Sequence, residues 1–409
     1  MKVAVIGLSP YLLTSRAKIN SWILQYLFLS GDQVIGLVWG HDTSYYIPDE
    51  ATGQFSYHFD YAGAKHEIPI IPFTLGENDS VAVYETLNRL QPDIILTVGD
   101  LPDFLFLRAV KSFCQHPFKW VWILTNYGYP LNENHIDLLR EVQAIICVNR
   151  QTYEMVKVFY AGILDMHYVG CNRSIYNYEG VTRGDKFRVM TCLKNEQKDN
   201  LPAVMEAGSQ IRIDIPCLEL YIHANVHDHG DFDLQLLKER FDPQGEFIVF
   251  PEKYVSILEG YAEQEYAAEL KKSDVFISTP MTTASGMSVF QAVSCGCFPI
   301  LSDEGINAEL AEVFDDYCWH LSLQKKDFLV PTMKFIGGDE KYLGICDMSY
   351  LKKRIVFNFI LNKHAREISK RLSESLAGNT HGKFLEKIKE VLNSVGRLND
   401  TLSLETVRR

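Results

Sequence analysis

The residues best placed for binding chemistry lie in a small, polar loop between a predicted strand and a predicted helix. The strand is Val275–Ser278, and Gly286 stands where the following helix begins. Glycine lets a ligand approach the backbone, and the first N–H groups of a helix have no partner inside the helix. A helix start of this kind binds anions, so the segment predicts a diphosphate site.

Gln291 lies a little more than one helical turn beyond Gly286, where its amide could reach a ribose. The same pattern is also typical of an ordinary strand–loop–helix junction with a serine N-cap. The segment alone does not separate the two interpretations.

A second polar cluster has the composition of a metal site but not its spacing. It contains His223, His227, Asp228, His229 and Asp231, with Asp233 after them. These side chains crowd a glycine-containing loop without the ligand spacing of a zinc or calcium site. We therefore expect no metal at this cluster. No Gly-x-Gly-x-x-Gly follows the first strand and no Gly-Lys-Ser/Thr is present, which argues against nicotinamide and ATP sites.

These residues are positioned by alternating short apolar runs and amphipathic stretches, the pattern of parallel sheets wrapped by helices. The predicted strands are 2–7, 34–39, 67–71, 93–98, 119–124, 144–148, 166–169, 187–193, 219–224, 246–250, 275–278 and 298–301. The alternation restarts after a polar boundary near residues 172–186. Residues 39–62 show no clear period.

The sequence therefore predicts an α/β protein with two Rossmann-like, doubly wound domains in series. Expected boundaries are 1–175 for the first domain, 176–350 for the second, 351–395 for C-terminal helices that pack back toward the first domain, and 396–409 for a frayed tail. Ligands of such folds bind at the carboxyl ends of the strands.

Composition excludes several other classes. The chain has 409 residues, is 47% hydrophobic and has a net charge of −12. No apolar run reaches the roughly 18 residues needed to span a bilayer. Met1-Lys2 leads directly into a strand, so we expect no signal peptide and a cytoplasmic location. The nine cysteines lack a framework spacing and are expected to be buried free thiols.

Charge is uneven along the chain. Residues 352–397 carry eleven Lys/Arg and four Glu. The interpretation most typical of such a run is a solvated helical face; a phosphate-bearing acceptor or a membrane surface is the alternative.

The segment from Ser278 to Asp303 resembles the donor-site signature of GT-B glycosyltransferases of family four. That signature runs Glu, Gly, Phe, Gly, three apolar or small residues, then Leu-Glu-Ala, with a Cys-Gly turn before a strand; here Gly286 and Cys295-Gly296 match it. Residues 194–207, 220–234 and 263–278 are similar to the family's preceding segments, and Leu96–Asp100 is a weaker match. The resemblance places His223 at a strand end and Asp233 near a helix start, where it can cap. The resemblance covers about residues 1–395.

The resemblance assigns donor-binding roles to residues in two loops, with departures. The signature's two glutamates fall at Thr283 and Gln291, and the arginine of the family's earlier loop falls at Lys194. The family's lysine falls at Asp199, with Lys198 one residue away. An amide binds a diol less strongly than a carboxylate does. Lysine keeps the positive charge of arginine but cannot make the two parallel hydrogen bonds of a guanidinium group. The donor-binding candidates are Lys194, Lys198, Thr283, Ser285, Gly286, Met287, Ser288 and Gln291. The alternative for each lysine is a solvated surface position.

The first domain must then supply the acceptor side. Candidates are Ser9 and Tyr11 after the first strand, Asp100 at a strand end, and Asn126 after residues 120–125. Asp100 is the candidate to orient the acceptor, with buried helix capping as its alternative, and Lys194 is the candidate to stabilise the leaving group.

The resemblance implies a hexosyl- or pentosyltransferase that moves a sugar from a nucleoside diphosphate, UDP first, to a hydroxyl with retention. In such chemistry the leaving diphosphate takes the acceptor's proton, so positive charge matters more than a strong base, and no metal or cofactor is expected. The acceptor is a free or lipid-linked saccharide or, as in some phage-type relatives, a hydroxymethylated base in DNA. The alternative is a catalytically decayed protein of the GT-B fold that binds nucleotides or interacts with a partner. The loss of both signature glutamates is the best argument for this alternative.

Overall fold

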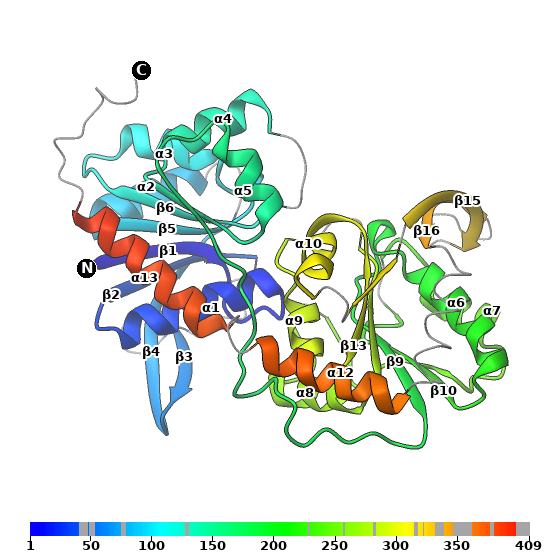
Figure 1. The fold of residues 1–409 in the computed structure, drawn as a ribbon. Coiled ribbons are helices and arrows are strands. Elements are labelled where there is room, and N and C mark those ends of the chain that lie inside the picture. The colour runs from blue at the N-terminus through cyan, green and yellow to red at the C-terminus, as the bar shows by residue number, and fades with distance from the viewer. Residues whose placement is uncertain are drawn as a thin grey trace. The chain divides into compact units, whose positions relative to one another are not determined.

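The computed structural model describes residues 1–40, 48, 54–74, 79–126, 131–227, 230–256, 258–280, 284–314, 318–321, 323–331, 339–346, 362–376 and 380–397. The chain divides into two compact units (Figure 1). Unit 1 comprises Met1–Val169 and Gly382–Arg409, and unit 2 comprises Gly170–His381. Each unit contains its own parallel sheet, so the predicted architecture of two Rossmann-like domains in series is confirmed.

Unit 1 alternates strands and helices from its first residues. Its elements are β1 (Lys2–Leu8), α1 (Ser15–Leu29), β2 (Gln33–Trp39), β3 (Phe55–Tyr61), β4 (Ala64–Pro72), α2 (Asp79–Leu90), β5 (Ile94–Gly99), the 3-10 helix η2 (Pro102–Phe104), α3 (Phe106–Phe113), β6 (Lys119–Leu124), α4 (Glu133–Arg140), β7 (Ala144–Cys147), α5 (Arg150–Lys157), β8 (Ile163–Met166) and α13 (His381–Arg397). The sheet order is β3-β4-β2-β1-β5-β6-β7-β8, and only the edge pair β3–β4 is antiparallel.

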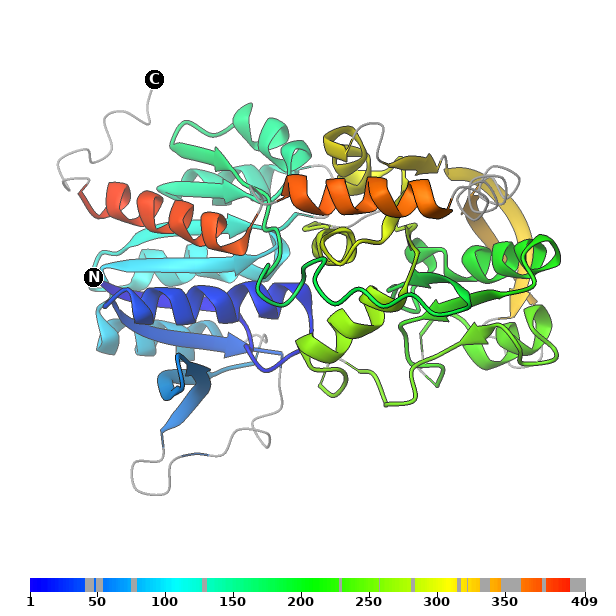
Figure 2. The ribbon, with the colours of Figure 1, turned by 60° about the horizontal axis from the view of Figure 1, so that its bottom comes forward.

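The central strands of unit 1 are predominantly apolar because helices cover both faces of the sheet. Every residue of β5 and β7 is buried. On one face a core forms around the stacked rings of Trp120 and Trp122, under side chains of α2, α3 and α4. Helix α1 packs on β1 and β2, and Figures 1 and 2 both show α13 along the face that α1 covers.

Unit 2 contains a second sheet of parallel strands with helices packed on it. Its elements are β9 (Phe187–Thr191), η3 (Gln197–Asp199), α6 (Leu201–Asp214), β10 (Leu218–Ile222), α7 (Leu234–Phe241), β11 (Ile248–Val249), α8 (Glu263–Lys272), β12 (Val275–Ser278), α9 (Met287–Ser294), β13 (Phe298–Ser302), α10 (Gly305–Phe314), β14 (Trp319–Leu321), β15 (Leu323–Pro331), β16 (Asp339–Cys346) and α12 (Asn362–Ser375). Strands β9 to β14 form the sheet β11-β10-β9-β12-β13-β14, and β15–β16 form a separate antiparallel hairpin. Side chains of α6 and α7 cover one face, and α9 and α12 pack together beside β13.

The predicted strands correspond to observed ones, but β8 ends at Met166, where the strand 166–169 was predicted to begin. Residues 39–62 contribute the edge strand β3. Strand β14 and the hairpin β15–β16 were not predicted. Helix α13 belongs to unit 1, whereas α12 belongs to unit 2. Residues 351–361, with which the expected C-terminal helices begin, lie outside the described residues. Among the described residues no helix is both long and apolar enough to cross a bilayer.

Candidate donor site at the carboxyl edge of the unit 2 sheet

The strand order of unit 2 places two loops beside each other at the carboxyl edge of the sheet. Strand β9 comes first in sequence; β10 and β11 follow on one side, and β12, β13 and β14 follow on the other. The order therefore reverses between β9 and β12, and ligands of doubly wound sheets bind at such a reversal. The loops that leave these strands, 192–200 and 279–286, contain the candidates of the sequence analysis.

Gly286 begins α9 in a conformation that favours glycine. Its φ is +58°, in the left-handed region, and a Cβ built there would lie 2.6 Å from Leu310 Cδ1. A side chain at this position would meet both backbone strain and α10. The first intrahelical bonds are donated by Val289 and Phe290 to Gly286 O. The N–H groups of Met287 and Ser288 precede this pattern and are those that a helix start offers to an anion.

The other candidates of this segment lie on or beside α9. Ser285, Met287 and Gln291 are buried, and Ser288 is half-buried. Gln291 is 4% exposed, and no hydrogen bond of its amide is present among the described residues. An amide this deeply buried ordinarily has a partner. Thr283 lies outside the described residues.

A buried asparagine of α10 fixes the start of loop 279–286. Asn307 is fully buried, and its Nδ2 donates to Ser278 O (3.2 Å) and Ser302 Oγ (2.9 Å). Ser302 Oγ in turn donates to Pro280 O (3.0 Å). Removing one member of such a network leaves buried groups without partners, which is costly. Asn307 therefore positions the first residues of the loop.

Loop 192–200 alternates buried anchors with outward charges. Asn195 bonds the backbone of Phe232 through both ends of its amide (2.7 and 3.1 Å). The Asp199 carboxylate accepts from Lys194 N (3.0 Å), and both residues Asp199 and Asn200 are buried. The backbone of the loop is thereby held from within.

Two hydrogen bonds join the two loops. Thr279 Oγ1 donates to Asp199 O (2.7 Å), and Asn200 Nδ2 donates to Thr279 O (3.0 Å). Asn200 adopts a left-handed backbone with φ +57°. Because all three residues are buried, the end of β12 and the start of α6 are held in one preorganised edge.

The lysines predicted to meet a diphosphate are both paired with one carboxylate. Lys198 Nζ lies 2.8 Å from Glu196 Oε2, and Lys194 Nζ lies 3.5 Å from Glu196 Oε1. Burial would raise the pKa of Glu196, but the hydrogen bond and charge of Lys198, together with Lys194, lower it below its ordinary value. Burial and the charge of Glu196 raise the pKa of Asp199 to about 6.

His223 follows β10 at the same edge but has an aromatic environment. Its ring centroid lies 4.7 Å from that of Tyr266 and 5.2 Å from that of Tyr261. Burial lowers its pKa to about 4, so the ring is neutral at pH 7. Asp233 Oδ1 accepts from Leu236 N (2.9 Å) at the start of α7, which confirms the predicted cap. Within the described residues no three His, Cys, Asp or Glu side chains gather as metal ligands; Asp228 and His229 lie outside them.

The acceptor-side candidates lie at the corresponding edge of unit 1. The sheet order of unit 1 reverses between β1 and β5, and Ser9 and Asp100 directly follow these strands. Asp100 is buried; its Oδ1 accepts from Leu101 N (2.8 Å), and its N donates to Asp103 Oδ2 (2.8 Å). Asp103 Oδ2 also accepts from Arg16 Nη1 (2.6 Å). The Asp100 carboxylate therefore bonds the backbone of the next residue, at the turn that leads into η2.

Tyr11 and Asn126 are engaged with neighbouring backbone. Tyr11 OH donates to Ser56 O (2.9 Å) and accepts from His58 N (3.1 Å), both on the edge strand β3. Asn126 is buried, and its carbonyl accepts from Asn149 Nδ2 (3.4 Å). The structure thus places Ser9 and Asp100 at one reversal point and ties Tyr11 to the β3–β4 hairpin.

Several side chains of the basic C-terminal stretch form ion pairs within their own unit. Lys387 lies 2.8 Å from Asp165, and Lys389 pairs with Asp32, both in unit 1. In unit 2, Arg366 donates through Nε and Nη2 to Asp274 Oδ1 (3.2 and 3.0 Å). These groups contribute to packing rather than to a free basic surface.

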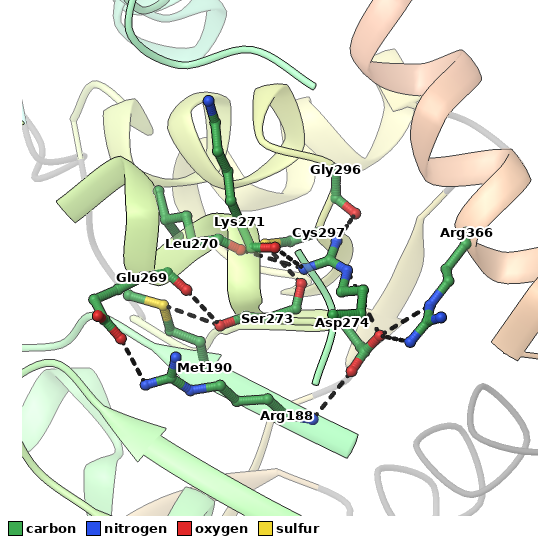
Figure 3. Close-up of polar contacts among 11 residues, drawn as sticks. Arg188, Met190, Glu269, Leu270, Lys271, Ser273, Asp274, Gly296, Cys297 and Arg366 are labelled. Atoms are coloured by element: carbon green, nitrogen blue, oxygen red, sulfur yellow. Dashed lines mark hydrogen bonds and ion pairs between the residues drawn. The ribbon is translucent and has the colours of Figure 1, made fainter. Parts of the chain in front are cut away.

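Asp274 belongs to a network at the amino edge of the unit 2 sheet, opposite the two loops (Figure 3). Its Oδ2 accepts from Arg188 N (3.1 Å), and the Arg188 guanidinium bonds Glu269 (2.8 Å). Arg183 donates to Lys271 O (2.9 Å) and Gly296 O (2.7 Å). The network joins the segment before β9 to α8, α9 and α12, and we assign it a structural role.

Comparisons with known proteins identify the fold. No family model matches the chain, and no curated protein matches it by sequence. Among solved structures, sucrose-phosphate synthase from Thermosynechococcus elongatus superposes with a TM-score of 0.71 at 13% identity, over 96% of this chain and 98% of that one. An α,α-trehalose-phosphate synthase (UDP-forming) from Burkholderia vietnamiensis gives 0.62 at 10%, over 96% and 99%. The pneumococcal O-GlcNAc transferase GtfA, in complex with UDP and GlcNAc, gives 0.60 at 12%, over 97% and 99%. These neighbours are GT-B glycosyltransferases, and the chain has their fold.

Proposed function

We propose that this protein is a retaining glycosyltransferase that moves a sugar from a UDP-sugar to a hydroxyl of a saccharide acceptor. The observation that carries the proposal is the preorganised edge of unit 2, where two loops joined by buried hydrogen bonds present a helix start and two lysines at a sheet reversal point. The names of the structural neighbours support it, since they include a UDP-forming synthase and a transferase bound to UDP.

The proposed chemistry follows from where positive charge is available. The bond between the anomeric carbon and the diphosphate oxygen breaks, and a bond from that carbon to the acceptor oxygen forms on the same face. The acceptor's proton passes to the departing phosphate oxygen. The N–H groups at the start of α9, with Lys194 and Lys198, stabilise the negative charge on the leaving group. No step requires a metal or cofactor.

Gln291 is the proposed partner of the ribose hydroxyls. It is buried on α9, the helix whose start would hold the phosphates, and no hydrogen bond of its amide is present among the described residues. In unit 1, Asp100 and Ser9 are proposed to line the acceptor side from the β1 and β5 strand ends. We also propose that the protein is a member of glycosyltransferase family four.

Charge favours a saccharide over DNA as the acceptor. The chain has a net charge of −12, and Lys387, Lys389 and Arg366 are already paired with carboxylates. A phage-type enzyme acting on hydroxymethylated bases would bind duplex DNA with a steep salt dependence. Mobility of duplex DNA on titration with the protein, repeated over a salt series, tests this alternative; we expect no shift.

The function is tested by calorimetry with UDP, followed by a mass-spectrometric screen of nucleotide-sugar donors. We expect UDP to bind and Gln291→Ala to weaken binding about tenfold, the range of one or two hydrogen bonds. Gln25→Ala, which removes a half-buried amide from α1 of unit 1, is the matched control and should leave UDP affinity unchanged. Absence of UDP binding at millimolar concentration contradicts the proposal. UDP binding without transfer or donor hydrolysis favours the catalytically decayed binding protein instead.

A further inference from the structure

We propose that Glu196 sets the affinity of the donor site for the leaving diphosphate, by holding the two site lysines until a phosphate displaces it. The inference rests on the proposed function, because it takes loop 192–200 as part of the diphosphate site. It gives an affinity-determining role to a residue that has no counterpart among the motif positions of the sequence analysis.

Lys194, Glu196 and Lys198 form a charged triad on loop 192–200. The two oxygens of one carboxylate face different ammonium groups, at 3.5 Å for Lys194 and 2.8 Å for Lys198. All three side chains keep access to solvent, with exposed fractions of 65%, 39% and 38% in chain order. The triad is therefore a surface feature of the loop and not part of the core.

Buried side chains anchor the backbone beneath the triad. Asn195, Asp199 and Asn200 are buried and bond Phe232, Lys194 N and Thr279 O respectively. These bonds fix the loop backbone on both sides of Glu196, and moving that backbone would break them. Rearrangement of the triad is therefore confined to its three long side chains.

Replacing Glu196 by a diphosphate as the partner of the two lysines costs little free energy. Partly exposed ion pairs contribute on the order of 0–1 kcal/mol each, so opening the triad costs little. A diphosphate carries more charge than a carboxylate and competes well for both lysines. Glu196 then remains within a few ångströms of the phosphates, where like charges repel by about 1–2 kcal/mol in a partly solvated site.

Removal of this charge should therefore strengthen binding, and more for a ligand with two phosphates than for one. We expect Glu196→Gln to lower the Kd for UDP by about fivefold to tenfold and the Kd for UMP by less than about twofold. Damage to the fold does not tighten binding, so the direction of the change separates this role from a merely structural one.

The experiment measures UDP and UMP affinities by calorimetry for the intact wild-type chain, Glu196→Gln and Glu246→Gln. Glu246 is the matched control because it pairs with Arg212 (3.4 Å) on the surface of the same unit. The inference predicts tighter UDP binding for Glu196→Gln alone, lost again in the triple variant Lys194→Ala/Glu196→Gln/Lys198→Ala.

Each remaining outcome overturns a defined part of the account. If the wild type binds UDP and Glu196→Gln binds it equally or less tightly, the inference is wrong and the proposed function stands. An equal gain for UDP and UMP would mean that Glu196 does not face the distal phosphate. If the wild type binds no UDP, the proposed function fails together with the inference.

Discussion

The two sheets reverse their strand order in the same way, but different side chains lie at their carboxyl edges. In unit 2 the reversal between β9 and β12 carries a glycine-started helix and an outward charged triad, with buried amides and hydroxyls beneath. In unit 1 the reversal between β1 and β5 carries Asp100 and Asp103, whose carboxylates bond local backbone and Arg16. At the unit 2 edge two lysines share one carboxylate, and at the unit 1 edge the carboxylates bond local groups.

Both edges nevertheless use the same kind of buried support. Buried asparagines act at both edges: Asn20 donates to Leu8 O (2.7 Å) at the end of β1, and Asn307 donates to Ser278 O at the end of β12. Shared supports thus hold the strand ends, while the side chains above them decide what binds. A strong anion site is expected only in unit 2.

The largest effect is expected from Gly286→Ala, which attacks the helix start of unit 2. The left-handed φ and the contact with Leu310 should cost about 2–3 kcal/mol of stability, and UDP affinity should fall at least about tenfold. Gly180→Ala is the control, since Gly180 has φ +69° with nothing within 4 Å of an added Cβ. It should cost about 1 kcal/mol and leave UDP affinity unchanged. Thermal unfolding and calorimetry measure both; equal affinities for the two variants would contradict a site at Gly286.

Asn307→Ala and Asn20→Ala compare the buried supports directly. Each should lower the free energy of unfolding by about 2 kcal/mol, because each removes a buried amide that bonds the carbonyl of a strand end. Only Asn307→Ala should also raise the KM for the donor, since it alone supports loop 279–286. Chemical denaturation with steady-state kinetics checks this. A rise in donor KM for Asn20→Ala would remove the distinction between the two edges.

Asp199→Asn tests the buried carboxylate under the triad. The folded pKa of Asp199, about 6, lies above its ordinary value of 3.8, so the folded state binds the proton more tightly. This contribution is fully present below about pH 4 and is lost as pH rises through 6. Relative to Asp199→Asn, the wild type should therefore lose on the order of 1–2 kcal/mol of stability between pH 4 and 7. Unfolding curves for both proteins across this range measure the difference, and parallel pH profiles would contradict it.

The smallest effect is expected from Tyr11→Phe in unit 1. The variant loses the two bonds to Ser56 O and His58 N on a partly exposed strand edge, worth about 0.5–1 kcal/mol. Hydrogen exchange at the His58 amide should accelerate about threefold to fivefold. UDP affinity should not change, and a change would indicate that Tyr11 takes part in donor binding.

The sequence was sufficient for most of the architecture. Buried parallel strands such as β5 and β7 are continuous apolar runs, so their pattern is unambiguous, and the Gly286 helix start follows from the residue type. The edge strand β3 escaped because its aromatic and polar residues, exposed on one side, resemble an irregular insertion. The hairpin β15–β16 depends on cross-strand pairing that short-range periodicity does not report.

The candidate site was less predictable because its contacts join distant residues. Lys194 and Lys198 could be selected by charge, but their common partner Glu196 depends on how loop 192–200 folds back on Asp199. The support from Asn307 likewise requires α10 to return beneath loop 279–286. A Glu between two lysines at i±2 is a signal that could have identified the triad, since all three side chains then emerge on one side of an anchored loop.

The central claim is that a diphosphate binds between loops 192–200 and 279–286 of unit 2. A crystal structure of the protein soaked with UDP tests it most directly. The account predicts phosphate oxygens within hydrogen-bond distance of the backbone N–H groups of Met287 or Ser288, with Lys194 or Lys198 turned from Glu196 toward them. UDP bound elsewhere, with these groups unchanged, would contradict it.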